Sequence, residues 1–453
     1  MIIFFAVIII LGLASFLFIS RKSNIAGFYL GLMENSKEPD LLTITFSQVT
    51  TWIFSRSLLT AAVLAYYYGL PGGIAYTAYY FSFLTGGYFV LKVRKKYNVN
   101  SIVEFFEKEY GVIGKWTYST IVTVRLISEI FANLIVIGLI FGDEGSNEYN
   151  ISIFLIMILA FSYSFLGGFR NSIKTDFFQM IVFLILFLFL IVSIYFSNFQ
   201  IEANLLLKNV NDFSNPGYAL ICVAFIQIWS YPLHDPVMMD RGFICSHKKT
   251  KQSFFLAFLL SSTCIFVFSL LGIFLSEISL ESISFFEAIK LNFGDNISYI
   301  VFFLLIVSAM STLDSTLSSA SKLVVLDLKL LKKNIFNGRI VMFIFSILGL
   351  VFIFFNTKDL FTAVAVSGTA ATFLTTSFIL KVICDISLSK TSLIISFILS
   401  ILGSILYYLE SQGLNNLLST YFVLEHKYNT LLIINLFILI ISFSSAFVFK
   451  KKV

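Results

Sequence analysis

The chain has 453 residues, of which 58% are hydrophobic and only 12% are charged, and 54 of them are Phe. A soluble domain of this size does not need so much apolar surface, so the composition predicts a polytopic all-helical membrane protein that folds as one integral domain, 1–453. The formal net charge of +6 does not indicate a nucleic-acid partner, because the basic residues cluster in short segments between apolar runs.

Thirteen apolar segments are expected to cross the membrane. The first follows no basic segment and is itself followed by Arg21 and Lys22, which favours an uncleaved span with its N-terminus outside over a signal peptide. The expected spans are 2–19, 42–69, 73–92, 117–142, 151–167, 175–197, 217–236, 253–276, 297–328, 337–356, 359–384, 390–408 and 430–449.

The segments between spans alternate in charge. Every second one is rich in basic residues, namely Arg21, Lys22, Lys37, Lys92, Arg94, Lys95, Lys96, Arg170, Lys174, Arg241, Lys248, Lys249, Lys251, Lys329, Lys332, Lys333, Lys381, Lys390 and Lys450–Lys452. The others hold few basic residues (Lys208, Lys290, Lys358 and Lys427) and several acidic ones (Asp143, Glu144, Glu148, Glu277 and Glu281). The positive-inside rule then predicts a cell-membrane protein with its N-terminus outside and its C-terminus in the cytoplasm.

The second and seventh spans are both interrupted. The second is too long and too polar for a simple helix, and near its middle it holds Gln48, Thr50, Thr51, Ser55 and Arg56. A kinked helix with packed hydroxyls would explain the Ser and Thr residues, but Arg56 needs an anion, carbonyls or water at that depth. In the seventh span, Pro232 and Pro236 prevent a regular helix.

These two broken helices lie five spans apart. That spacing predicts a five-plus-five inverted-repeat core of the LeuT-like type, formed by spans 2–11 with its binding site at the midplane. The first repeat is expected at 42–197 and the second at 217–384. An extra N-terminal span at 1–20 and two C-terminal spans at 390–449 would lie outside the repeats.

The ninth span carries a stripe of hydroxyl groups. Helical spacing places on one face Ser308, Ser311, Thr312, Ser315, Ser319 and Lys322. Close helix packing would explain the serines alone. Asp314 lies on the flank of the stripe, and a carboxylate at membrane depth usually faces a cavity, an ion or a partner. Because hard cations such as sodium prefer oxygen ligands, the stripe favours a cation site.

Two further features precede that span. In the segment 164–180, Gly167 and Gly168 are expected to turn the chain, with Thr175 as N-cap and Asp176 opening the sixth helix, where its charge would complement the helix N-terminus. In the fourth span, Arg125 and Glu129 stand at i and i+4, and they either neutralise each other or bind substrate.

An enzyme is not expected. The sequence has no P-loop pattern, and its three His residues show no metal-ligand spacing. His234 and Asp235 lack a partnered nucleophile motif. No cofactor and no obligate protein partner is implied.

Four segments resemble the sodium:solute symporter family, and the resemblance covers nearly all of the chain. SYSFLGGFRNSIKTDFFQ at 162–179 is similar to the family's glycine-pair segment followed by Thr-Asp and Gln, and AMSTLDSTLSSASKLVVLDL at 309–328 to its Ser- and Thr-rich ninth span. QIWSYPLHDPVMMDRGF at 227–243 resembles its seventh span more loosely, and TTWIFSRSLLTAAVLAYYYGL at 50–70 resembles its polar second span.

The resemblance implies cation ligands. Aligning Thr51-Trp52 with the small-residue–Trp pair of several members puts the sodium-binding carbonyls of the second span at Phe46 and Val49. The ninth span would add the Ser308 carbonyl and the hydroxyls of Ser311 and Thr312. Some members bind a second sodium, and the matching positions here, candidates for a second cation or a proton, are Asp176, Asp314 and Ser315.

The resemblance also implies a small-molecule substrate bound near the breaks. The substrate-binding candidates are Gln48, Thr51, Trp52, Arg125, Gln227 and Trp229. Gln48 stands where some members have an acidic residue, and the second span faintly resembles the urea-transporting branch. The substrate therefore stays open among amino acids, carboxylates, sugars, urea and other solutes.

The predicted function is sodium-coupled symport of a small organic solute by alternating access in the lipid bilayer. Alternatives are proton coupling through Asp176 or Asp314, with a solute such as urea, a passive channel, and a transporter-like sensor. Because the sequence ends three residues after Lys450, no appended signalling module is expected.

Overall fold

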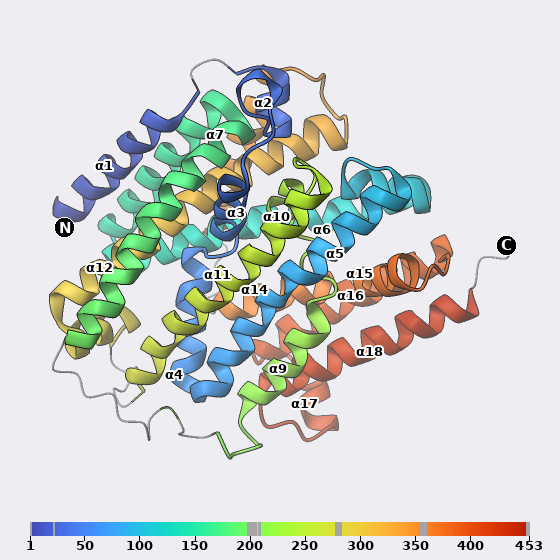
Figure 1. The fold of residues 1–453 in the computed structure, drawn as a ribbon. Coiled ribbons are helices and arrows are strands. Elements are labelled where there is room, and N and C mark those ends of the chain that lie inside the picture. The colour runs from blue at the N-terminus through green and yellow to red at the C-terminus, as the bar shows by residue number, and fades with distance from the viewer. Residues whose placement is uncertain are drawn as a thin grey trace.

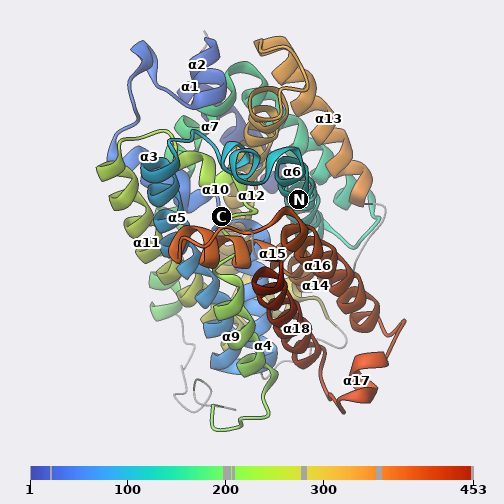
Figure 2. The same ribbon diagram turned by 90° about the vertical axis from the view of Figure 1, so that its right-hand side faces the viewer.

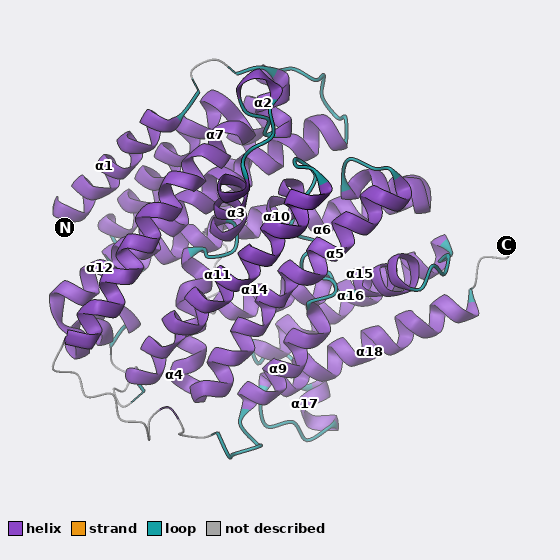
Figure 3. Cartoon of the chain, viewed as in Figure 1, coloured by secondary structure: helices purple, strands orange, loops and turns teal. Residues whose placement is uncertain are grey.

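Helices make up the secondary structure of the computed structural model, which describes residues 2–20, 23–196, 206, 210–276, 283–353 and 360–449 (Figure 3). No strand occurs in these ranges. The helices are α1 (Ile2–Phe18), α2 (Ile25–Leu30), α3 (Leu41–Thr50), α4 (Ser55–Ala78), α5 (Ser82–Tyr97), α6 (Ile102–Phe141), α7 (Asn147–Phe196), α9 (Pro216–Gln227), α10 (Pro236–Arg241), α11 (His247–Phe274), α12 (Phe285–Lys322), α13 (Ile335–Ile353), α14 (Leu360–Ala370), α15 (Phe373–Thr376), α16 (Lys390–Ser411), α17 (Leu417–Tyr421) and α18 (Lys427–Val448). Short 3₁₀ turns at Glu34–Ser36 and Tyr79–Phe81 and π-helical turns at Leu323–Asp327 and Ser377–Ile383 complete the set.

Nine of the described helical segments are long and apolar enough to cross a membrane, and three shorter apolar helices lie at Ile8–Phe18, Leu41–Thr50 and Pro216–Gln227. Two long segments each contain parts of two expected spans: Ser55–Tyr97 overlaps the second and third, and α7 overlaps the fifth and sixth. Helices α4, α6, α7 and α12 each bend at a glycine with positive φ. The expected polytopic all-helical architecture is confirmed. The predicted span ends at 197, 354–356 and 359 lie outside the described residues.

The bend in α7 corrects one detail. It lies at Gly168, where φ is 59° and an added Cβ would stand 2.5 Å from the carbonyl oxygen of Phe28, so only glycine fits. The helix continues directly after this bend. Thr175 is therefore an interior residue, and its predicted role as N-cap was wrong. Its hydroxyl oxygen lies 2.9 Å from the carbonyl oxygens of both Asn171 and Ser172 and 2.6 Å from Asp314 Oδ2.

The second and seventh spans are both broken, as predicted. Helix α3 ends at Thr50 and α4 starts at Ser55, with Phe54 in an extended conformation. Helix α9 ends at Gln227, and α10 starts at Pro236 with Asp235 capping its N-terminus. Each break frees backbone groups in the middle of the bundle, where they need another partner.

Helix α12 is largely buried in the bundle and packs against α7, α6 and α13. Helix α3 packs between α7 and α11. Helices α16 and α18 pack side by side at the edge of the molecule (Figure 2). Helix α1 and the last turns of α18 lie on opposite sides of the bundle (Figure 1).

Segments that were expected on one side of the membrane do meet. Arg94, at the end of α5, donates to the Gly242 carbonyl at 2.7 Å and to Thr250 Oγ1 at 3.1 Å. Lys96 pairs with Asp385 after the eleventh span. Other charged residues used for this prediction lie outside the described residues: Arg21, Lys22, Lys208, Glu277, Glu281, Lys358 and Lys450–Lys452.

Candidate functional site

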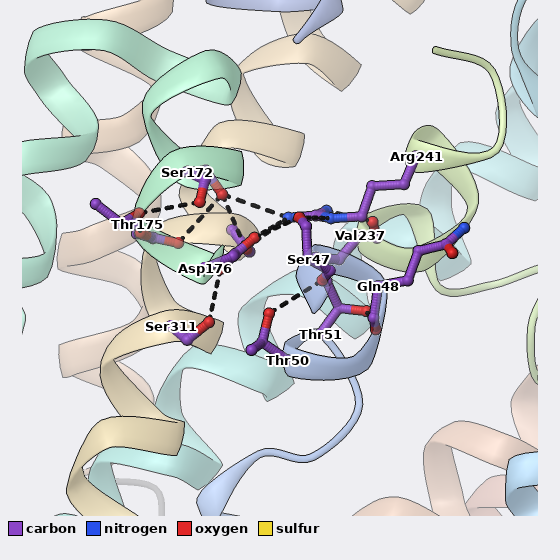
Figure 4. Close-up of polar contacts among 12 residues, drawn as sticks. Ser47, Gln48, Thr50, Thr51, Ser172, Thr175, Asp176, Val237, Arg241 and Ser311 are labelled. Carbon is purple, nitrogen blue, oxygen red and sulfur yellow. Dashed lines mark hydrogen bonds and ion pairs between the residues drawn. The ribbon is translucent and has the colours of Figure 1, made fainter. Parts of the chain in front are cut away.

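A buried polar cluster lies where α3, α7, α10 and α12 meet, and Asp176 is at its centre (Figure 4). Its side chain is fully buried. Oδ1 accepts a hydrogen bond from Ser311 Oγ at 2.6 Å. Oδ2 accepts one from Ser47 Oγ at 2.6 Å, and Ser315 Oγ lies 3.2 Å from both oxygens. Asp176 therefore ties α7 to the broken second span and to the hydroxyl stripe of α12.

The cation of this cluster is Arg241, which sequence reasoning placed in a cytoplasmic segment. It is fully buried, and its Nη2 forms an ion pair with Asp176 Oδ2 at 2.8 Å. The same nitrogen donates to Ser315 Oγ at 2.7 Å, while Nε donates to Ser47 Oγ at 2.6 Å. The backbone of α10 itself accepts from Nη1, at the carbonyl of Val237. Arg241 thus closes the cluster from the side of the seventh span.

Asp314 belongs to the same cluster but faces α7. It is fully buried, and its carboxylate accepts hydrogen bonds from Thr175 Oγ1 at 2.6 Å and Ser172 Oγ at 3.2 Å. Ser172 Oγ also lies 2.8 Å from Ser315 Oγ, which links the two carboxylates through hydroxyl groups. Among the described residues, no Lys or Arg forms an ion pair with Asp314.

The candidate sodium ligands lie where α12 meets the break of the second span. Thr312 Oγ1 lies 3.5 Å from the Thr50 carbonyl oxygen and 2.9 Å from the Ser308 carbonyl oxygen. Ser308 Oγ donates to the carbonyl of Ile53. The carbonyls of Thr50 and Ile53 were not predicted, although their place at the end of a broken helix marks them as free acceptors.

Two predicted carbonyls lie on the other side of that contact. The Val49 carbonyl accepts from Trp52 N at 3.1 Å and from Ile53 N at 2.9 Å, which closes the turn after α3. Phe46 is half-buried, and its ring stacks on Phe177 with the centroids 5.6 Å apart. The described hydrogen bonds therefore bring the candidate ligands Ser308 and Thr312 to the break at Ile53 and Thr50, and not to the Val49 carbonyl.

A small cavity of about 10 Å³ opens at this contact. Its walls are Thr50, Ile53, Gln179, Met180, Phe183, Val307, Ser308 and Ser311. That volume is close to the space that one water-sized sphere occupies. The wall contains hydroxyl, amide and carbonyl-bearing residues, so it offers oxygen atoms to a small hard cation.

An aromatic cluster surrounds Trp52, a candidate substrate-binding residue that lies in the break of the second span. Trp52 packs against Tyr80, Phe83 and Tyr231 with ring centroids 5.2–5.6 Å apart. A second cavity of about 10 Å³ is lined by Trp52, Phe54, Ser57, Tyr76, Tyr79, Tyr80 and Tyr231. The tyrosines were not predicted, because in the sequence they look like ordinary residues of an apolar span.

The remaining substrate candidates lie at different distances from this cluster. Gln227 accepts from Tyr79 at 2.9 Å and donates to Asn435 of α18 at 3.2 Å. Trp229 is half-buried and packs on Phe378, with ring centroids 5.7 Å apart. Trp229 therefore faces the eleventh span and not the other candidates.

Gln48 and Thr51 lie one turn apart at the end of α3. Thr51 Oγ1 donates to the Gln48 carbonyl at 2.6 Å. The Gln48 side chain is fully buried, and neither of its amide atoms has a hydrogen-bond partner among the described residues. Figure 4 shows this side chain pointing away from Asp176. A buried amide without partners is costly, which makes Gln48 a candidate for contact with a ligand.

Four buried charges lie next to the aromatic cluster. Arg125 pairs with Glu129 on its own helix and with Asp235 at 3.0 Å across the break of the seventh span. Arg56 lies 3.7 Å from Glu129, which supplies the anion that an arginine at this depth needs. The Arg125 guanidinium also lies 5.7 Å from the centre of the Tyr231 ring. Two positive and two negative groups therefore balance one another beside the candidate substrate residues.

Another cavity lies at the ends of α10 and α12. It has a volume of about 460 Å³, and its walls include Asp240, Lys322 and Asp327. Lys322 Nζ lies 2.6 Å from Asp240 and 3.0 Å from Asp327. Asp240 lines this cavity, whereas the next residue of α10, Arg241, belongs to the Asp176 cluster. Two consecutive residues of α10 therefore pair in different environments.

No protein-family model matches the chain, and no curated protein matches it either. Two solved structures are similar to it over nearly their whole length. One is a Na⁺-coupled sialic acid symporter in a substrate-bound outward-open state, with a TM-score of 0.67 and 15% sequence identity, covering 99% of this chain and 98% of that one. The chain has the fold of a sodium-coupled symporter.

The other structure is a nucleobase-cation-symport-1 family transporter in a closed conformation with bromovinylhydantoin bound. Its TM-score is 0.59 with 9% sequence identity, and the match covers 94% of this chain and 97% of that one. At these identities the similarity establishes the fold, and the apolar helices agree with it. The chain is therefore a multi-pass, all-helical membrane protein.

Proposed function

We propose that this protein is a secondary active transporter that couples the uptake of a small organic solute to sodium, by alternating access. We also propose that it belongs to the sodium:solute symporter family, with repeats at 42–197 and 217–384. The observation that carries the proposal is the contact of the α12 hydroxyls with the broken second span. Ser308 and Thr312 reach the carbonyls of Ile53 and Thr50 there.

The sodium ion is proposed to bind at this contact. Its ligands are the carbonyls of Phe46 and Val49, the carbonyl of Ser308 and the hydroxyls of Ser311 and Thr312. Asp176 supports this site. The Ser311 hydroxyl donates a hydrogen bond to the Asp176 carboxylate, so the lone pairs of the Ser311 oxygen point away from Asp176 and stay available to the ion. Such outer partners orient ligands and increase their basicity.

The solute is proposed to bind beside Trp52, at the aromatic cluster between the two breaks. Tyrosine and tryptophan rings offer flat apolar contact with polar edges. The Gln48 amide supplies one donor and one acceptor that have no other partner among the described residues. Because the nearby charges of Arg56, Arg125, Glu129 and Asp235 balance, a neutral or zwitterionic solute fits better than one with a net charge.

Sodium entry would drive the cycle. A sodium ion that moves inward down the membrane potential releases about 2.3 kcal/mol per 100 mV. At ~1.4 kcal/mol per tenfold, that supports roughly a fortyfold solute gradient. Coupling requires that sodium favours one conformation of the bundle, which the contact between α3 and α12 can provide. The protein is proposed to lie in the cell membrane with its N-terminus outside and its C-terminus in the cytoplasm.

The test is uptake by purified protein in proteoliposomes, with a panel of labelled amino acids, carboxylates, sugars, ureas and heterocycles. Each solute is measured with an inward sodium gradient and with potassium in place of sodium. Uptake of at least one solute is expected to depend on sodium. A solute that accumulates equally without sodium, and responds instead to a pH step, would show proton coupling and overturn the sodium proposal.

A further inference from the structure

The second candidate cation position already contains a positive group of the protein itself. Asp176 and Ser315 are two of its three proposed ligands, and both are bound to Arg241 Nη2, at 2.8 Å and 2.7 Å. Figure 4 shows the Arg241 side chain reaching Asp176 from α10, and Ser311 contacting the same carboxylate from α12. The oxygen atoms of Asp176 and Ser315 therefore accept hydrogen bonds from Arg241, whereas the third proposed ligand, Asp314, accepts them from Thr175 and Ser172.

The guanidinium is held there by a complete set of contacts. Each of its three nitrogens donates, with Ser47, Val237, Asp176 and Ser315 among the acceptors. These hydrogen bonds are shielded from solvent, because the Arg241 side chain is fully buried. A planar, always charged group with fixed N–H directions suits such a pocket.

The charges of the pocket agree with this arrangement. Arg241 neutralises Asp176, and a sodium ion next to them would meet a fixed positive charge. Two unit charges about 4 Å apart in a protein interior repel strongly enough to weaken binding by roughly a thousandfold. Ser311 connects this filled position to the first site, because it donates to the other oxygen of Asp176 at 2.6 Å.

We propose that Arg241 is a built-in cation that takes the place of a second coupling ion, so that the protein binds a single sodium ion, at the first site. This inference rests on the proposed sodium-coupled function. It names Arg241 as the residue that determines the ion stoichiometry. Transport would then carry one sodium ion per solute molecule, although the sequence pattern offers ligands for two.

The test is equilibrium binding of radioactive sodium to purified protein in nanodiscs. We expect one bound sodium ion in the wild type and two in Arg241→Ala, which frees Asp176 and Ser315. Asp176→Asn in the Arg241→Ala background is expected to return the stoichiometry to one. The matched control is Lys322→Ala, which removes another buried cation on the far side of α10 and should leave one ion bound.

Two ions bound to the wild type would overturn the proposal, and so would a folded Arg241→Ala that still binds one. If Arg241→Ala does not fold, the double variant Asp176→Asn/Arg241→Gln removes both charges together. One ion in that variant and in the wild type supports the proposal, whereas two in the wild type overturn it.

A second measurement separates this inference from the proposed function. Methylguanidinium is expected to raise the thermal unfolding midpoint of Arg241→Ala by several degrees, and to leave the wild type and Lys322→Ala unchanged. If the wild type binds no sodium, sodium coupling is wrong, but this rescue still supports Arg241 as the resident cation of the pocket. No stabilisation of a folded Arg241→Ala by methylguanidinium would count against it.

Discussion

Removal of the Ser311 hydroxyl should weaken sodium binding directly. Ser311 Oγ lies 2.6 Å from the buried carboxylate of Asp176 and lines the small cavity beside Thr50. A hydrogen bond to a charged group contributes about 1.5–3 kcal/mol. At ~1.4 kcal/mol per tenfold, Ser311→Ala is therefore expected to weaken sodium affinity by roughly 10- to 150-fold.

The assay is the concentration dependence of radioactive sodium binding, which needs no knowledge of the solute. The matched control is Ser298→Ala on the same helix, because Ser298 is also fully buried but donates only to its own helix, at the Gly294 carbonyl. The control should bind sodium like the wild type. Equal affinities in Ser311→Ala and Ser298→Ala would refute the assignment of the first site.

Three further predictions concern stability, measured by thermal unfolding in detergent. Glu129→Gln leaves Arg56 and its neighbours with excess positive charge and should cost about 3–5 kcal/mol of stability. The double variant Glu129→Gln/Arg56→Met should recover part of this loss. An unchanged unfolding midpoint in Glu129→Gln would contradict the charge balance. Gly272→Ala should cost about 1–3 kcal/mol of stability, because the added Cβ would stand 1.8 Å from the Ala62 carbonyl oxygen, where α11 meets α4. If Gly272→Ala unfolded at the same temperature as the wild type, this close approach would be disproved. Burial, and to a smaller extent the charge of Lys427, lowers the pKa of His426 from 6.5 to about 4. The contribution of neutral His426 to stability is therefore complete above pH 6.5 and disappears as the pH falls towards 4. His426→Asn should still cap α18, but without this pH dependence.

The breaks and the hydroxyl stripe could be predicted because local chemistry determines them. Pro232 and Pro236 cannot continue a helix, and this holds in any surroundings. Asp314 at membrane depth required polar partners, and the structure supplies Ser172 and Thr175. These predictions depend on which groups must be satisfied and not on where each neighbour lies.

Arg241 was missed for the opposite reason. In the sequence it stands before a basic run with Lys248 and Lys249, so it was counted as a residue of a cytoplasmic segment. Whether such an arginine is solvated or buried depends on where α10 places it after the break, which is a tertiary property. One signal was present, because Arg241 follows Met238 and Met239 in a stretch that is apolar enough to be buried.

The aromatic cluster was missed in a similar way. Tyr76, Tyr79 and Tyr80 lie in an apolar stretch of the third span, where tyrosines commonly serve as packing residues. Their significance comes from Tyr231, which lies far along the chain and meets Tyr79 and Trp52 only because both broken spans pass through the same part of the bundle. A single sequence contains no information on that pairing.

Two consecutive residues of α10 should respond very differently to neutralisation. Asp240 pairs with Lys322, but Lys322 keeps a second carboxylate in Asp327 at 3.0 Å, and all three line the cavity of about 460 Å³. Because Asp327 remains as an ion-pair partner of Lys322, Asp240→Asn should cost only about 1 kcal/mol, the net contribution of one hydrogen bond.

Arg241 has no such reserve, because its removal leaves Asp176 buried without its ion-pair partner. Arg241→Gln is therefore expected to cost about 3–5 kcal/mol. Thermal unfolding of both variants in the same detergent gives the comparison, and Asp240→Asn should lie close to the wild type. If Asp240→Asn were as destabilising as Arg241→Gln, the distinction between an ion pair with a second carboxylate in reserve and an ion pair without one would be wrong.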